Sequence, residues 1–142
     1  MQAILITLAL EGYESLADFC ANDDNRSIAL RAKIMAMTGI LTRQLHDARL
    51  RHNSLYAKHF FVKKEGADVD VRIIDLERLK WLPFYGLIRH KDLSRIIRRG
   101  GSLTMEDLGA ILSSYYQYGK DLRNTAMARE LNALLARQER SL

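Results

Sequence analysis

The stretch His52-Asn-Ser-Leu-Tyr-Ala-Lys-His59, followed by Ile73-Ile-Asp-Leu-Glu77, decides the fold of this chain. Two short runs of β-branched and aromatic residues join these motifs, and Glu65-Gly-Ala-Asp68 separates the runs. The glycine in the separator supplies the positive φ that a short hairpin loop favours, so the pattern predicts a β-hairpin. Because a hairpin brings its two outer ends together, we expect the side chains of His59 and Asp75 to approach each other.

Helices are predicted on the N-terminal side of the hairpin, over residues 14–50. A short helix of about two turns is expected from Tyr13 to Cys20, and the turn and cap residues Asn22-Asp-Asp-Asn25 precede a much longer one. The long helix is predicted from Ser27 to about Leu50, with its apolar residues on one broad stripe. That stripe comprises Ile28, Leu30, Ile34, Met37, Ile40, Leu41, Leu45 and Ala48. We expect this helix to be a buried rod that positions the loop beginning near Arg51.

The chain after the hairpin is also predicted to be helical, over residues 89–140, in three stretches with apolar stripes. These stretches are 91–99, 104–118 and 122–140, with Gly100, Gly101 and Gly119 as stops and Ser102 and Thr104 as candidate caps. At the other end, the apolar run Ala3–Leu10 indicates a buried strand within residues 1–13. With residues 51–76 as loop and hairpin, the sequence predicts one α+β domain, mostly α, over residues 1–142.

Composition excludes several classes of protein. Of the 142 residues, 48% are hydrophobic and 27% are charged, which is ordinary for a globular domain. Cys20 is the single cysteine and cannot form an internal disulfide, and the sequence shows no signal peptide and no apolar segment long enough to span a bilayer. The net charge of +5 favours acidic partners. However, the basic run Arg89–Arg99 lacks the aromatic residues of a nucleic-acid site, and the histidines lack zinc-ligand spacing.

Four segments have a distinctive order and spacing: Leu10-Glu-Gly-Tyr-Glu-Ser-Leu16, His52–Val62, Val71–Glu77 and Lys91-Asp-Leu93. Together they resemble the hinge, catalytic loop, metal-binding strand and following helix of the lipopolysaccharide kinase (Kdo/WaaP) family, and most closely its InaA-like branch. The resemblance implies the C-terminal lobe of a protein-kinase-like fold. No Gly-rich loop and no strand lysine precede these segments, so we expect the N-terminal lobe to be absent from this chain.

The resemblance implies a site for ATP and Mg²⁺. Asp75 closes the apolar strand and is expected to bind Mg²⁺ on the nucleotide phosphates, and His59 stands where kinases place a second metal ligand. The backbone around Glu11 and Tyr13 is expected to bond the adenine. The residues alone also fit structural roles, namely a turn cap at Asp75, a backbone-bonded histidine at 59 and an ordinary turn at residues 11–13.

The candidate catalytic residues are His52, Ser54 and Lys58. Ser54 occupies the place of the aspartate base of the family's sugar kinases, and a serine hydroxyl cannot take up a proton near neutral pH, where a positioned base contributes about 10²–10⁴-fold. His52 is expected to brace the loop and is also the best nearby candidate for a base. Lys58 fits either a contact to the γ-phosphate or a surface position. Asp92 resembles the acid that braces the loop's backbone, and it also fits a first-turn helix acid.

The resemblance therefore implies phosphoryl transfer from ATP to a sugar hydroxyl of the lipopolysaccharide core, by positioning and electrostatics. Ser54 leaves open a pseudokinase, meaning a stress-response or binding module without catalysis. A third alternative is a basic adaptor that docks on anionic membrane or lipopolysaccharide through Arg89–Arg99. The expected location is the cytoplasm, with attachment to the inner membrane left open together with the oligomeric state. Nucleic acid is not an expected partner.

Overall fold

A computed structural model describes residues 11–22, 28–83, 85–99 and 101–118 and the single positions 136 and 140. The elements in chain order are strand β1 (Glu14–Ser15), helices α1 (Leu16–Ala21) and α2 (Ile28–Asp47), strand β2 (Leu50–Arg51), the 3₁₀ turn η1 (Ala57–His59), strands β3 (Phe60–Glu65) and β4 (Asp68–Ile73), the 3₁₀ turn η2 (Leu76–Arg78), strand β5 (Lys80–Trp81), and helices α3 (Tyr85–Arg98) and α4 (Met105–Tyr118). This mostly helical α+β architecture confirms the predicted fold class. The predicted strand 3–10 and helix 122–140 lie outside the described residues.

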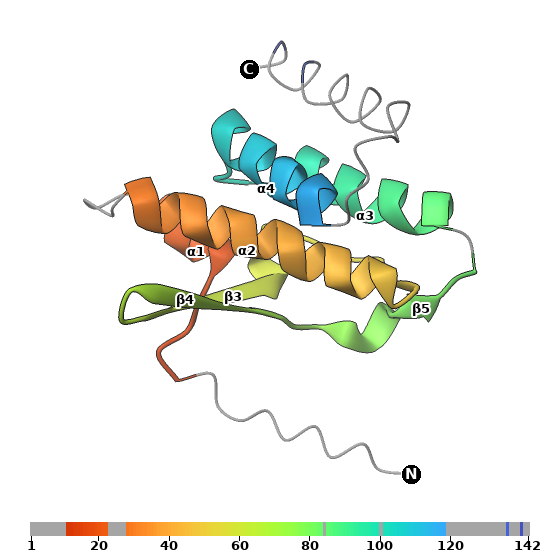
Figure 1. The fold of residues 1–142 in the computed structure, drawn as a ribbon, viewed down its shortest axis with the longest axis horizontal. Coiled ribbons are helices and arrows are strands. Elements are labelled where there is room, and N and C mark those ends of the chain that lie inside the picture. Colours follow the sequence, from red (N-terminus) through yellow and green to blue (C-terminus); the bar gives the residue numbers. More distant parts are fainter. Residues whose placement is uncertain are drawn as a thin grey trace.

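The predicted β-hairpin is confirmed. Strands β3 and β4 pair antiparallel, with Phe60 opposite Ile73 and Glu65 opposite Asp68, and Gly66 adopts a φ of +62° in the loop between them. Strand β1 pairs antiparallel with β3 and completes a three-stranded sheet, while β2 and β5 form a separate pair. Helix α2 lies across one face of the hairpin, and α3 and α4 lie beyond it (Figure 1).

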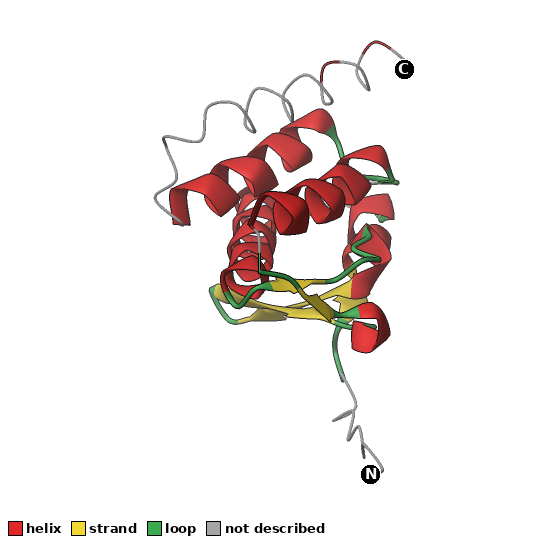
Figure 2. Ribbon diagram, turned by 90° about the vertical axis from the view of Figure 1, so that its right-hand side faces the viewer, coloured by secondary structure: helices red, strands yellow, loops and turns green. Residues whose placement is uncertain are grey.

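Figure 2 shows the same layers from the side, with α2, α3 and α4 gathered on one face of the strands. The hydrophobic core fills the space between these layers. Its fully buried members come from every layer: Leu16 of α1, Ile34 of α2, Phe60 of β3, Leu93 and Ile97 of α3, and Leu108, Ile111 and Tyr115 of α4. Leu55, in the loop before η1, is also fully buried, so the core anchors the segment that carries the candidate site.

Helix α2 confirms the predicted long rod but corrects its buried face. Of the predicted stripe only Ile34 is fully buried, whereas Ile28 is 85% exposed and Met37 is 37% exposed. The buried face is instead largely polar and consists of Ile34, Met35, Thr38, Gly39, Thr42, Arg43 and His46. The Thr38 and Thr42 hydroxyls each donate to a backbone carbonyl one turn earlier, at 2.8 Å, so burial leaves neither hydroxyl unsatisfied.

The helix boundaries differ from the predicted ones in two places. Helix α1 begins at Leu16 rather than near residue 13, because the Ser15 hydroxyl caps it by accepting from the backbone N–H of Asp18. Helix α3 begins at Tyr85, six residues before the predicted stretch. Thr104 caps α4 as predicted: its hydroxyl accepts from the N–H of Asp107, whose carboxylate accepts from the N–H of Thr104. Among the described residues, no helix has the length and apolarity needed to cross a membrane.

Candidate functional site

The two outer ends of the hairpin meet as the sequence predicts. His59 Nε2 lies 3.2 Å from Asp75 Oδ2, and the backbone N–H of Ile74 donates to the carbonyl of His59 at 2.9 Å. The His59 residue is buried, whereas the Asp75 side chain is 44% exposed. Asp75 has a left-handed backbone with a φ of +60°, a conformation that aspartate tolerates better than most residues, and this turn ends the strand direction.

The hydrogen bonds of His59 fix which ring nitrogen faces Asp75 as an acceptor. Nδ1 donates to the carbonyl oxygen of Ser54, so in the neutral ring Nε2 carries the lone pair. That lone pair faces a carboxylate oxygen at 3.2 Å, and two acceptors at this distance require a shared proton or a shared cation. Adjacent ligands of an octahedral Mg²⁺ lie about 2.9 Å apart, so the pair is spaced suitably for a metal ion. The described residues hold no cluster of three or more metal-binding side chains, so other ligands must come from a substrate or water.

His52 is held by two backbone contacts and is completely buried. Its Nδ1 accepts from the N–H of Ser54 at 3.2 Å, and its Nε2 donates to the carbonyl of Ile74 at 2.9 Å. The second contact ties the loop to the residue immediately before Asp75. Because both ring nitrogens are engaged, the geometry supports the bracing role for His52 and leaves no ring nitrogen to act as a base.

Asp92 braces the same loop from α3. Its Oδ2 accepts from the N–H of His52 at 2.8 Å and its Oδ1 accepts from the N–H of Asn53 at 3.0 Å. Asn53 has a positive φ of +68°, and the guanidinium of Arg95, one turn after Asp92, donates to its carbonyl. Asp92 lies in the middle of α3, so the alternative of a first-turn helix acid is wrong.

Two further residues complete this network and are absent from the sequence prediction. His46 Nε2 donates to Asp92 Oδ2 at 2.9 Å, and the Tyr115 hydroxyl donates to His46 Nδ1 at 2.6 Å. Both side chains have no exposed surface. The spacing of Thr38, Thr42 and His46, four residues apart, places these polar groups on one face of a helix and is the sequence pattern that would have indicated a buried polar network.

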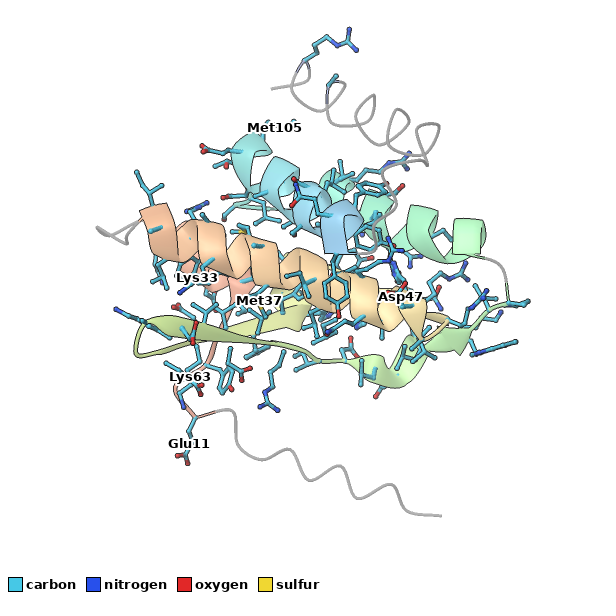
Figure 3. The ribbon with its side chains drawn as sticks, viewed as in Figure 1. Glu11, Lys33, Met37, Asp47, Lys63 and Met105 are labelled. Atoms are coloured by element: carbon cyan, nitrogen blue, oxygen red, sulfur yellow. The ribbon has the colours of Figure 1, made fainter. Side chains whose placement is uncertain are left out.

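The remaining predicted site residues are less closely associated. Ser54 is buried next to His52, whereas Lys58 is exposed, with its Nζ 5.8 Å from the centre of the Tyr56 ring. The Tyr13 hydroxyl donates to Asp70 on β4, and this carboxylate raises the pKa of the phenol. Glu11 is exposed and points away from the hairpin on the side opposite to α2 (Figure 3). The structure thus joins residues 52, 54, 59, 75 and 92 and leaves the adenine contact at residues 11–13 a prediction.

Comparison with known proteins agrees with this arrangement. The family model described as "Lipopolysaccharide kinase (Kdo/WaaP) family" matches residues 1–116. The chain belongs to this family. A solved structure described as "WaaP in complex with acyl carrier protein" is 25% identical in sequence, with a TM-score of 0.56. The match covers 88% of this chain but only 58% of that protein, and no curated protein matches.

Family membership confirms the resemblance on which the kinase-like fold was predicted. In the lipopolysaccharide kinase chain described here, the loop at residues 52–59 and the hairpin that follows it are supported jointly by α2, α3 and α4. Placement in the InaA-like branch stays a prediction.

Proposed function

We propose that this member of the lipopolysaccharide kinase family binds ATP with Mg²⁺ and serves phosphoryl transfer to a sugar hydroxyl of the lipopolysaccharide core. The observation that carries the proposal is the pairing of His59 Nε2 with Asp75 Oδ2 at 3.2 Å. Mg²⁺ is usually held by one or two protein side chains together with substrate phosphates, and this pair supplies that number. When bound, the metal neutralises charge on the nucleotide phosphates.

The outer face of the hairpin suits the rest of the nucleotide. Phe61 follows His59 by two residues and alternates with the buried Phe60 and Val62, so its half-exposed ring belongs to the face away from the core. An aromatic ring at that place offers a stacking surface for adenine. Tyr13 contacts β4 of the same hairpin through Asp70, which supports adenine contacts from the backbone around Glu11 and Tyr13.

A thermal-denaturation titration with ATP, in the presence and absence of Mg²⁺, tests the proposal. ATP at about 100 times its Kd adds roughly 2.7 kcal/mol to the free energy of unfolding. We expect this gain to require Mg²⁺ and to disappear in Asp75→Ala, whereas Glu77→Ala, which removes an exposed acid two residues later, should retain it. A gain of equal size in Asp75→Ala, or no gain in the unmodified chain, would remove the support for a nucleotide site here.

A second candidate function is nucleotide binding without phosphoryl transfer. It is favoured by the loop itself, because Ser54 replaces the usual aspartate and both nitrogens of His52 bond to the backbone. Loss of a positioned base alone lowers the rate by about 10²–10⁴-fold. Phosphorylation of a core sugar should therefore be compared in the unmodified chain and in Ser54→Asp. A gain of about 10²-fold, with ATP binding unchanged, indicates a transferase site that lacks only its base, whereas no gain indicates a binding protein.

A further inference from the structure

A cavity of about 300 Å³ lies beside the loop that carries His59. It is bordered by α1, by the loop before η1 and by the chain just after α3. The residues that line it are Ala17, Tyr56, Ala57, Lys58, Arg99 and Gly101. The two charged members of this lining are both cations, so the cavity combines a small apolar wall with positive charge.

Lys58 and Arg99 converge on one aromatic ring. The Nζ of Lys58 and the Cζ of Arg99 each lie 5.8 Å from the centre of the Tyr56 ring, and both residues are exposed. In the part of the chain that the structure describes, neither forms an ion pair, although other cations such as Arg31 and Arg72 pair with carboxylates. Two neighbouring cations without a counterion create a local positive potential that attracts an anion.

The cavity adjoins the candidate metal pair. The rings of Tyr56 and His59 have centroids 5.5 Å apart, and His59 in turn faces Asp75 at 3.2 Å. A molecule that packs on the other side of Tyr56 therefore lies one aromatic ring away from the site at which the proposed function places the nucleotide phosphates. Arg99 follows directly on α3, the helix whose Asp92 holds the loop, so one element fixes both the loop and the cavity wall.

We propose that this cavity is a subsite for an anionic sugar, with Lys58 and Arg99 binding a carboxylate or phosphate group and the Tyr56 ring packing against the sugar. A guanidinium binds such planar or tetrahedral anions through paired hydrogen bonds, and an ammonium adds a compact charge. The ring supplies apolar contact area with little conformational freedom to lose. The role of the bound sugar as phosphoryl acceptor rests on the proposed function, but its binding to the subsite does not require the nucleotide.

The shape of the site favours a discrete ligand over a flat anionic surface. Exposed lysines and arginines attract a membrane without any hollow between them, whereas these two cations border a cavity whose floor is formed by Tyr56 and small side chains. The volume is in the range that holds a single sugar ring with one charged group. Membrane binding is therefore an outcome of the test and not part of the proposal.

The subsite is tested by isothermal titration of the full chain, without nucleotide, using glucose 6-phosphate, glucuronate, glucose and inorganic phosphate. We expect both charged sugars to bind, and glucose and inorganic phosphate to bind at least about tenfold more weakly, since each lacks one half of the recognition. Lys58→Gln and Arg99→Gln should each weaken glucose 6-phosphate binding about tenfold. Lys64→Gln, an exposed cation at the far end of β3, serves as the matched control and should leave it unchanged.

Each contrary outcome has a defined meaning. Equal binding of charged and neutral sugars overturns the anion contact, and equal binding of inorganic phosphate and glucose 6-phosphate overturns the sugar contact. Retained affinity in the double variant Lys58→Gln/Arg99→Gln overturns the site, as does binding only to anionic lipid vesicles. The ATP titration of Asp75→Ala is read separately, so sugar binding without Mg²⁺–ATP binding sinks the nucleotide site while leaving the subsite in place.

Discussion

His46 Nε2 lies 2.9 Å from Asp92 Oδ2, and both residues are completely buried. The same carboxylate accepts from the backbone N–H groups of His52 and Asn53, and the Tyr115 hydroxyl donates to the other nitrogen of His46. Helices α2, α3 and α4 thus meet at one buried acid that fixes the loop of the candidate site. The conformation of this loop depends on how three helices pack.

Replacing His46 by leucine should loosen this loop as well as lower stability. The change leaves the Tyr115 hydroxyl without its acceptor and removes one donor from Asp92, so the free energy of unfolding should fall by about 1.5–3 kcal/mol. The amide protons of His52 and Asn53 should also exchange faster. Urea denaturation and hydrogen exchange measure the two effects.

Gln44→Leu is the matched control for His46→Leu, because Gln44 is exposed on the same helix. Its cost should stay within about 0.5 kcal/mol, with no change in exchange at residues 52 and 53. If exchange at these two amides is the same in both variants, the link from α2 to the loop is refuted and His46 acts only in packing.

The hairpin and the approach of its ends could be predicted from the sequence because the relevant forces are local. Gly66 sets the turn, and alternation along β3 and β4 sets which side chains face the core. Once that register is fixed, His59 and Asp75 have to lie at the same end of the sheet. Asp92 was predicted as the loop brace only through its spacing in the family pattern.

The buried face of α2 could not be predicted from apolar periodicity. Thr38, Thr42 and His46 are buried because partners far away in the sequence, or carbonyls of their own helix, satisfy them. Apolar periodicity counts such residues as exposed, and it assigned Met37 to the core although this residue is 37% exposed. The tertiary partners of His46, which lie 46 and 69 residues later, leave no trace in a short sequence window.

Gly39→Ala should destabilise the protein even though alanine is the better helix former. A Cβ at position 39 would overlap the carbonyl oxygen of Ile111 and the hydroxyl of Ser114 on α4, and the carbonyl belongs to a helix backbone that cannot move aside alone. Overpacking of this kind costs about 1–3 kcal/mol, against a gain of about 1 kcal/mol in helix propensity. Gly109→Ala is the control, because a Cβ there meets nothing within 4 Å, and it should stabilise the protein by about 0.5–1 kcal/mol in the same denaturation assay.

Asp107 should contribute stability that depends on pH. Burial raises the pKa of Asp107, but the hydrogen bonds from Arg31, at 2.8 and 2.5 Å, and from Thr104 outweigh burial and hold the pKa below its ordinary value of 3.8. A lowered pKa means that the contribution is complete at neutral pH, declines as the pH falls below about 4, and is lost below the folded-state pKa. At pH 7, Asp107→Asn should lower the free energy of unfolding by about 1.5–3 kcal/mol.

Denaturation of both proteins between pH 7 and pH 2.5 checks the sign as well as the size for Asp107→Asn. The difference between them should be largest at neutral pH and should shrink in acid. Asp68→Asn is the control, since the Asp68 carboxylate is 87% exposed and lies 3.5 Å from Lys33, an arrangement typically worth less than about 1 kcal/mol. A difference that grows as the pH falls would contradict the assignment of a stabilising carboxylate.

His59→Asn should separate the metal-binding role of position 59 from its structural role. The amide oxygen of asparagine is a harder ligand than imidazole, and Mg²⁺ prefers oxygen, so the Mg²⁺ concentration that gives half of the ATP-dependent stabilisation should fall. The same variant loses the hydrogen bond from Nδ1 to Ser54, so without ligand the free energy of unfolding should fall by about 1 kcal/mol. His59→Leu loses both the hydrogen bond and the ligand, and it should be destabilised similarly but lose the dependence on Mg²⁺. If His59→Leu keeps the Mg²⁺ requirement of the unmodified chain, the lone pair that faces Asp75 does not bind the metal, and the 3.2 Å pair is held by a shared proton instead.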